Sequence, residues 1–446
     1  MPGLPASEIV RLNKEYTLFE WSAQAAYHPI PVTRAKGVYF WDADGKRYID
    51  FNSQLMNVKI GHGDKRVIRA IQEQAAVLPY VSPYHATEAR GRLGELLAEI
   101  TPGNLKKSFF TSGGAESNEN AVKIARLVTG RHKIIARYRS FHGGTAAAIT
   151  LTGDPRRWAS EPGIPGVVHV LDPYRYRCRW CGELPACNLN CLNHIEDVIQ
   201  FEGPNTIAAV IVEGVTGTNG IIVPPDGYMQ GLREMCTRHG ILLIVDEVMS
   251  GFGRTGEWFS VNHWNVVPDI LCVAKGLTSG YVPMGAAIVS EPIAAYFDDH
   301  VLWGGLTYGA HALGCAAAIA TIGVYQEDRL IERAKEMGKV LGGELEKLKA
   351  AHPSVGDVRY IGLFSILELV RSRKSREPMA PFNARPDQMG PMALVGKFLR
   401  DSGLYTFVRW NTIFVNPPLC ITRDELMEGL AILDRALEIA DDHVLE

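Results

Sequence analysis

Long apolar runs are missing from this sequence of 446 residues. None approaches the roughly 18 residues that a membrane-spanning helix needs, and the N-terminus lacks the apolar core of a signal peptide. An excess of one charge is missing too, because charged residues make up 21% of the chain and the formal net charge is −3. No sequence-wide basic field therefore favours nucleic acid or an anionic membrane. We expect a cytoplasmic protein that acts on small molecules, with no nucleic-acid or membrane partner.

Cysteine is scarce as well. Eight cysteines in a chain of this length do not indicate a disulfide scaffold, but four of them crowd together as Cys178, Cys181, Cys187 and Cys191. The spacing C-x2-C-x5-C-x3-C could present four thiolates to zinc, although the five-residue gap is tight for a zinc loop. We favour the interpretation that these are free thiols in a surface insertion, and we assign no metal.

Two short apolar blocks each end in a reactive side chain. The block Ile241 to Val245 reads as a parallel strand buried on both faces, and Asp246 and Glu247 follow it. A second block, Ile270 to Ala274, ends in the same way at Lys275. Ligands bind at the carboxyl ends of such strands, so this acid and this amine are placed to meet one, although a buried salt bridge is the structural alternative.

Pyridoxal phosphate is a cofactor that needs such a pair. Its aldehyde forms a Schiff base with a lysine, and a carboxylate keeps its ring nitrogen protonated. The runs ILLIVDEVMSGFGRTG and LCVAKGL resemble the signature of the class III aminotransferases of fold type I. The resemblance implies that Lys275 is the Schiff-base lysine, that Asp246 pairs with the pyridine nitrogen and that Val248 packs against one face of the ring.

A glycine-rich turn predicts the phosphate site. Ser112, Gly113, Gly114 and Ala115 lie between an apolar strand and an amphipathic helix in the run FFTSGGAESNENAVKIARLVTG. Such a turn exposes backbone N–H groups at the positive end of the helix dipole, which favours an anion. Resemblance of the FTSGGAESNE run to the family makes this turn the expected cradle of the cofactor phosphate.

Three further residues receive cofactor roles from the resemblance. Phe141, in SFHGGT, matches the aromatic residue that stacks on the ring opposite the valine, and His142 lies next to the cofactor. Thr307, in WGGLTYGAH, matches the threonine that one subunit lends to the phosphate site of the other. The following Gly-Ala-His departs from the usual family pattern. Because Thr307 is expected to serve the other subunit, we expect a homodimer or a dimer of dimers.

Four residues are expected to meet the substrate. Trp21 and Met56 fall in segments that line the substrate pocket in the family, and Glu213 stands at the end of another apolar strand, where the family has a gate residue that also adjoins the cofactor. Arg409 lies between apolar segments and therefore needs an anionic partner. Glu213 or a substrate anion would serve, and we expect Arg409 to pair with Glu213 and to leave that pair when a keto acid enters.

The expected fold is α/β. The resemblance implies a fold-type I transferase whose large domain holds a central, mostly parallel sheet of the seven-stranded type, with a smaller α+β domain made from both chain ends. We place the large domain at residues 71–329 and the small domain at 1–70 and 330–446. Gly37 to Asp50 predicts a hairpin around Asp44-Gly45, and Thr422 to Glu425 predicts a capping box.

The expected reaction is a ping-pong transamination. Residues 212–236 and 281–290 look most like ω-amino acid transaminases, with taurine as the first choice of donor, giving sulfoacetaldehyde, and pyruvate or 2-oxoglutarate as acceptor. β-Alanine, 4-aminobutyrate, diamines and other amines stay open as donors. An aminomutase or a decarboxylating relative is a further alternative, and so is a non-catalytic binding module that uses the cysteine cluster as a metal-bound loop.

Overall fold

A seven-stranded sheet forms the centre of the computed structural model, which describes residues 3–182, 184 and 186–445. The strand order is β4-β10-β9-β8-β7-β5-β6. β10 is antiparallel to both neighbours and the other pairs are parallel, which confirms the predicted mostly parallel sheet. The strands are β4 (Leu105–Thr111), β5 (Lys133–Arg137), β6 (Val167–Val170), β7 (Ile207–Glu213), β8 (Leu242–Asp246), β9 (Ile270–Val273) and β10 (Gly285–Ser290).

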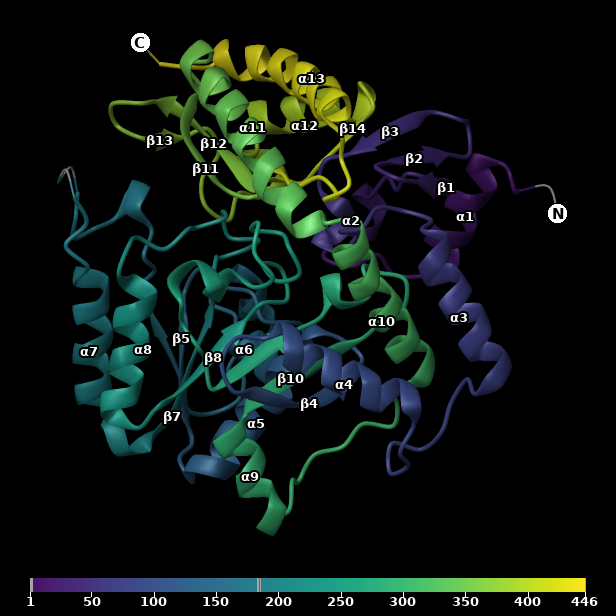
Figure 1. Cartoon of the computed structure of the whole chain (residues 1–446). Coiled ribbons are helices and arrows are strands. Elements are labelled where there is room, and N and C mark those ends of the chain that lie inside the picture. Colours follow the sequence, from purple (N-terminus) through teal and green to yellow (C-terminus); the bar gives the residue numbers. More distant parts are fainter. Residues whose placement is uncertain (1–2, 183, 185, 446) are drawn as a thin grey trace.

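Helices surround the sheets (Figure 1). They are α1 (Ala6–Tyr16), α2 (Ser53–Met56), α3 (Lys65–Val77), α4 (Glu88–Ile100), α5 (Gly114–Thr129), α6 (Ala146–Leu151), α7 (Asn190–Glu202), α8 (Tyr228–His239), α9 (Glu291–Asp299), α10 (Ala312–Glu327), α11 (Leu330–Ala351), α12 (Pro391–Asp401) and α13 (Arg423–Asp441). Among the described residues, none of these helices is both long and apolar enough to span a bilayer.

Both faces of the central sheet are covered, which explains why its strands are apolar throughout. On β8, Ile244 belongs to a buried cluster with Ile124 of α5, whereas its neighbour Leu243 belongs to a second cluster with Leu232 of α8. Alternate residues of a strand point to opposite faces, so two cores require an unbroken apolar run. The hydrophobic blocks of the sequence are therefore the strands whose ends carry the site.

Strand register brings acidic side chains together. Glu213 at the end of β7 pairs in register with Asp246 at the end of β8, and Asp246 pairs with Cys272 of β9. Lys275 follows the end of β9 after one residue, Ala274. The three ends lie side by side because the strands are parallel.

Two smaller sheets complete the fold. β1 (Val32–Lys36), β2 (Tyr39–Asp42) and β3 (Arg47–Asp50) form one sheet with β14 (Leu404–Tyr405), which is parallel to β3. β11 (Val355–Ile361), β12 (Phe364–Ser372), β15 (Val408–Arg409) and β16 (Thr412–Val415) form the other, and β13 (Glu377–Pro378) pairs with β12. The hairpin predicted between Gly37 and Asp50 is confirmed as β2 and β3.

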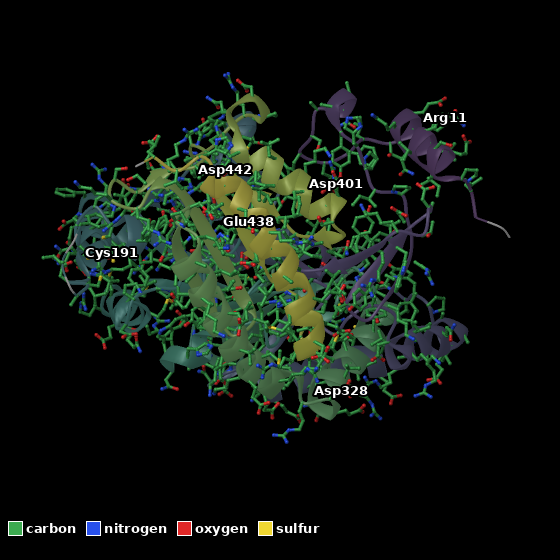
Figure 2. The ribbon with its side chains drawn as sticks, turned by 90° about the horizontal axis from the view of Figure 1, so that it is seen from above. Arg11, Cys191, Asp328, Asp401, Glu438 and Asp442 are labelled. Atoms are coloured by element: carbon green, nitrogen blue, oxygen red, sulfur yellow. The ribbon has the colours of Figure 1, made fainter. Side chains whose placement is uncertain are left out.

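The chain ends meet through these elements. Figure 1 shows the purple strands β1 to β3 close to the yellow helices of the C-terminus. The predicted capping box is confirmed, with the Thr422 hydroxyl accepting the Glu425 N–H at the start of α13. Figure 2 shows α13 crossing the top of the molecule, with Glu438 and Asp442 near its end. The domain limits at 71 and 330 stay a prediction.

The cysteine insertion follows β6 and ends in the first turn of α7, which contains Cys191, and two of its residues, 183 and 185, fall outside the described part. Its four cysteines are free thiols. The Sγ atoms of Cys181 and Cys187 are 3.4 Å apart. Cys181 and Cys191 are buried, so the cluster is less exposed than expected for a surface insertion. Within the described residues, no group of three or more metal-ligating side chains has the geometry of a metal site.

A histidine joins the end of α11 to α13. The Nδ1 atom of His352 is 2.6 Å from Oδ2 of Asp441, and its Nε2 atom is 2.9 Å from Oδ1 of Asp434. Only the protonated ring donates from both nitrogens. Burial lowers the pKa of His352, but hydrogen bonds to the two aspartates outweigh burial and raise the pKa above its ordinary value of 6.5.

Stability should therefore depend on pH through His352. Because its pKa is raised in the folded state, its contribution is fully present below the unfolded pKa and is lost as the pH rises through the folded pKa. His352→Gln should lower the unfolding free energy by about 1–2 kcal/mol near pH 6 and by much less near pH 9. Urea unfolding at both pH values measures this. His300→Gln is the control, because the ring of exposed His300 contacts Tyr296 instead of an acid; an unchanged pH dependence in His352→Gln would contradict the assignment.

Candidate active site

One cavity of about 1680 Å³ opens at the carboxyl ends of β7, β8 and β9. Glu213, Asp246 and Lys275 lie on its wall. The sheet thus brings together residues from three separate strand ends. The sequence-predicted site residues that line this cavity are Trp21, Met56, Ser112, Gly113, Gly114, Ala115, Phe141, His142, Glu213, Asp246, Val248, Lys275 and Arg409.

Asp246 is held in one orientation by three donors. Its Oδ2 atom accepts from Nδ2 of Asn118 at 2.7 Å and lies 2.8 Å from Nδ1 of His142. Its Oδ1 atom accepts the N–H of Val248 at 3.0 Å. A carboxylate fixed in this way is suited to pair with a protonated ring nitrogen, which is the predicted role of Asp246.

Asn118 was not anticipated from the sequence. Its amide bridges Asp246 and the carbonyl oxygen of His142, at 2.7 and 2.8 Å. The available signal was its place in the SGGAESN run, inside the helix that opens at the glycine turn. A buried polar residue there needs partners, and the strand end supplies them.

Lys275 lies in a short turn after β9 with a left-handed φ of 35°. Burial lowers the pKa of Lys275, Asp246 and Glu213 oppose this effect, and Arg156 adds to the lowering. A lysine with a lowered pKa has a larger fraction of unprotonated amine, which is the nucleophilic form. The geometry thus favours Lys275 as the residue that bonds an aldehyde.

The start of α5 also lines the cavity, through Gly114 and Ala115. Its first turn is preceded by Gly113, and the N-cap has no side-chain hydrogen bond. A Cβ added to Gly114 would lie 3.0 Å from both methyl groups of Val248, so the backbone approaches Val248 more closely than a side chain allows. This helix end can hold a phosphate.

These features match three parts of pyridoxal phosphate. The α5 N-terminus suits the phosphate, Asp246 suits the ring nitrogen and Lys275 suits the aldehyde. Val248 and Phe141 line the same cavity, as two residues that enclose a ring must. The residues of the chain therefore fit the cofactor, and the individual roles stay predictions.

Thr307 lies apart from this arrangement. It is exposed and does not line the cavity formed by its own chain. Its carbonyl oxygen accepts the hydroxyl of Tyr80 at 2.8 Å. A role in the phosphate site therefore requires a second subunit, as the sequence predicted.

Arg409 and Glu213 do not form the expected pair. Glu213 accepts the N–H of Phe141 at 3.0 Å and that of Gly217 at 2.6 Å, so both carboxylate oxygens already have donors. Burial raises the pKa of Glu213. Arg409 instead lies 3.2 Å from Oδ2 of Asp154. We expected Arg409 to move from Glu213 to a keto acid. In the structure Asp154, not Glu213, holds Arg409.

Asp154 and Arg156 are the main residues that the sequence interpretation missed. Asp154 is fully buried and accepts from Nε of Arg156 at 3.0 Å, from Arg409 and from Nδ2 of Asn219 at 3.0 Å. Burial raises the pKa of Asp154, but the bonds from Arg156 outweigh it and the net shift is downward. The signal was DPRR, in which an aspartate caps a turn that begins with proline and carries two arginines.

The two arginines have a surplus of positive charge. Arg156 and Arg409 share the one carboxylate of Asp154 and both line the cavity. Burial, and then repulsion by Arg156, lower the pKa of Arg409 to about 10. The Arg156 guanidinium also lies 3.6 Å from the ring centroid of Phe141, and Trp21 meets that ring edge-on at 6.2 Å. This side of the cavity can hold an anion.

We predict that Lys275→Ala abolishes turnover without releasing pyridoxal phosphate. Lys275 alone supplies the amine, whereas Asp246 and the α5 N-terminus hold the ring and phosphate. Turnover should fall below about a hundredth of wild type. Activity and the cofactor retained after gel filtration are measured together, with surface Lys107→Ala as the control. Higher residual turnover in Lys275→Ala would contradict the role.

Comparisons with known proteins identify the family of this chain. The family model described as Aminotransferase class-III matches residues 22–437. Taurine:2-oxoglutarate aminotransferase from Bifidobacterium kashiwanohense, solved with PLP and glutamate, is 41% identical, with a TM-score of 0.95 and full coverage of both chains. Taurine–pyruvate aminotransferase of Bilophila wadsworthia is 33% identical over 96% of this chain and 97% of the relative. Putrescine–pyruvate aminotransferase of Pseudomonas aeruginosa is 31% identical over 94% of this chain and 96% of the relative. The chain therefore belongs to the class III aminotransferases and is a pyridoxal-phosphate-dependent transaminase.

Proposed function

We propose that this transaminase moves the amino group of an ω-amino sulfonate to a 2-oxo acid by a ping-pong mechanism. Taurine is the first choice of donor, with sulfoacetaldehyde as its product, and 2-oxoglutarate or pyruvate is the acceptor. The observation that supports this proposal most strongly is the pair of guanidinium groups at Arg156 and Arg409, which share one carboxylate on the cavity wall.

The arginine pair favours a donor with an anionic end. One aspartate neutralises only one of two guanidinium groups, and the Nε atom of Arg409 is buried without a partner among the described residues. A sulfonate has three oxygen atoms, so it can accept from both arginines while its amine lies at Lys275. Arginine binds such anions well because its donors form a rigid fork.

The same pair favours 2-oxoglutarate among acceptors. The distal carboxylate of 2-oxoglutarate can take the place of the sulfonate. Pyruvate has no second anionic group, so the two arginines would have no substrate anion to bind. The relative from Bifidobacterium kashiwanohense is named for 2-oxoglutarate and the one from Bilophila wadsworthia for pyruvate. We therefore place 2-oxoglutarate first and keep pyruvate as the alternative.

Other amine donors differ in how they interact with the positive charge of Arg156 and Arg409. β-Alanine and 4-aminobutyrate carry a carboxylate and can use the same arginines. A diamine would bring a second ammonium group toward two guanidinium groups, which like-charge repulsion disfavours. The match to a putrescine aminotransferase thus carries less weight than the charge of the cavity. An aminomutase or decarboxylating reaction would differ in its products from the same donor.

The residues divide the chemistry among them. Bound pyridoxal phosphate supplies an aldehyde that accepts the amino group and a ring that withdraws electrons. Asp246 keeps the ring nitrogen protonated. Lys275, whose pKa is lowered by burial, takes up a proton from the substrate carbon at its Nζ atom and returns it. Arg156 and Arg409 orient the substrate through its anionic end.

Removal of either arginine should damage the use of anionic substrates. Arg156→Leu should weaken the binding of taurine and 2-oxoglutarate more than that of pyruvate, because pyruvate has no distal anion. Arg409→Leu should raise the apparent Michaelis constant for 2-oxoglutarate by the equivalent of about 2–5 kcal/mol, the range for one partner of a buried charge pair, and that for pyruvate by less. Each half-reaction is followed separately through the absorbance of the bound cofactor.

The matched control is Arg157→Leu, because Arg157 is next in sequence to Arg156 but pairs with Glu161. It should retain both half-reactions. If Arg156→Leu and Arg409→Leu turn over taurine as well as wild type does, the arginines do not bind the sulfonate. If wild type prefers a diamine to every anionic donor, the proposed substrate class is wrong.

We also propose that the active unit is a homodimer or a dimer of dimers. Thr307 and Tyr308 are exposed in one chain, and Trp303 in the same segment is 72% exposed. Exposed aromatic residues in one segment are typical of a surface that a partner covers. Thr307 would then reach the phosphate site of the other subunit.

Hybrid dimers test this exchange of Thr307. Lys275→Ala and Thr307→Ala chains are each expected to be impaired at limiting cofactor, but a mixed dimer contains one site with both residues intact. Refolded equal mixtures should regain up to about a quarter of wild-type activity, since half of the dimers are mixed and each has one good site. The unmixed variants, refolded in the same way, are the controls. No gain on mixing would show that Thr307 acts within its own chain or not at all.

A further inference from the structure

Lys59 is a fully buried lysine that does not line the cavity. Its Nζ atom donates to the carbonyl oxygen of Met249 at 2.9 Å and to that of Gly251. Both acceptors belong to the loop that follows Asp246, and Met249 itself lines the cavity. The amine of Lys59 thus holds the backbone of that loop from behind.

The stem of the same side chain packs on the turn that carries Lys275. A Cβ added to Gly276 would lie 2.8 Å from Cδ and 3.1 Å from Cε of Lys59. The Cβ atom of Phe252 would be equally close, at 2.8 Å, so a side chain in place of Gly276 would force Lys59 or Phe252 to shift. Tyr325 also binds Gly276, because its hydroxyl donates to the Gly276 carbonyl oxygen at 2.8 Å.

This turn needs support from its surroundings. Lys275 has a left-handed φ of 35°, which is unfavourable for a residue with a side chain. Such a conformation costs on the order of 1–3 kcal/mol and persists only where neighbouring groups hold it. The side chains of Lys59, Phe252 and Tyr325 surround the next residue, and Lys59 and Tyr325 hold the backbone from which the Lys275 amine projects.

The hydrogen bonds of Lys59 suit this role. Burial lowers the pKa of Lys59 well below its ordinary value, repulsion by Arg254 and Lys275 adds to this effect, and Glu247 opposes it. The amine has enough N–H groups for both carbonyl acceptors, so Lys59 can hold the loop through two hydrogen bonds.

We propose that Lys59 is a positioning residue that ties the loop after Asp246 to the turn of Lys275 and so sets the placement of the amine relative to the carboxylate. This inference rests on the proposed function, because it concerns the same site. It differs from a purely structural role: Lys59 joins two reactive strand ends, and the position of Lys275 should change when that link is cut.

The test compares Lys59→Met with Lys133→Met. Methionine keeps an apolar stem of similar length and removes the amine. Lys133 is the matched control, because its Nζ atom also donates to a backbone carbonyl, that of Glu202, but at the amino end of β5. Lys59→Met should lower kcat by about 10- to 100-fold with little change in KM, the scale expected for a small misplacement of a reacting group. Lys133→Met should change neither.

Two further measurements report position directly. The pH midpoint of the cofactor absorbance, which depends on the surroundings of Lys275, should move in Lys59→Met and stay in place in Lys133→Met. Hydrogen exchange of the cofactor-free protein should become faster together in residues 247–253 and 275–278, where Gly251 donates to Glu247 and Leu277 to Ala274. Lys59→Gln, which keeps two N–H groups, should recover part of the lost kcat.

The outcomes separate the possibilities. If Lys59→Met loses stability but keeps the wild-type kcat and absorbance midpoint, Lys59 is only a core residue and the proposal is overturned. If Lys59→Met does not fold, Lys59→Gln and Tyr325→Phe take its place, and an unchanged midpoint in both overturns the proposal equally. Failure of the proposed function appears elsewhere, as absence of taurine turnover in wild type. The comparison is then made with the donor that wild type does use, and hydrogen exchange does not depend on any donor.

Discussion

The carboxylate of Asp246 is the group on which the rest of this site depends. Its three donors come from α5, from the loop of His142 and from the residue two positions on, so one side chain joins the helix after the glycine turn, the segment that carries Phe141 and the central sheet. The adjoining Glu247 N–H donates to the Cys272 carbonyl oxygen, which links this strand end to the strand that leads to Lys275. Any movement of Asp246 would therefore change the cofactor cavity on three sides.

The second constraint is electrostatic. Asp154 is buried with two arginines, and leaving any one of these charges without a partner in the interior would be costly. The shared carboxylate keeps both guanidinium groups near the cavity while neutralising only one of them. Both guanidinium groups therefore lie on the cavity wall with one carboxylate between them, and the proposed preference for an anionic substrate rests on that charge.

Much of the arrangement could be predicted because it is local in the chain. The strands β8 and β9 are apolar on both faces, and the residue types that follow them, Asp246 and Lys275, mark the site wherever the sheet is parallel. The glycine turn before α5 is equally local, since a helix start and its N–H groups involve a few consecutive residues. The partner of Arg409 could not be predicted in this way. The sequence indicates that Arg409 needs an acidic partner and favours Glu213, whereas in the structure the partner is Asp154.

The sequence by itself, through its local patterns and the family resemblance that they carry, indicated the class of fold, the strand ends that carry Asp246 and Lys275, and the glycine turn at the start of α5, because periodicity, capping and turn chemistry act over short stretches of chain. Only the tertiary structure decided which distant groups meet. Arg409 and Asp154 are separated by 255 positions, and the acceptors of Lys59 lie 190 and 192 positions away. Such pairings depend on how separate elements pack, since a buried charge or donor takes whichever partner the folded chain brings within reach.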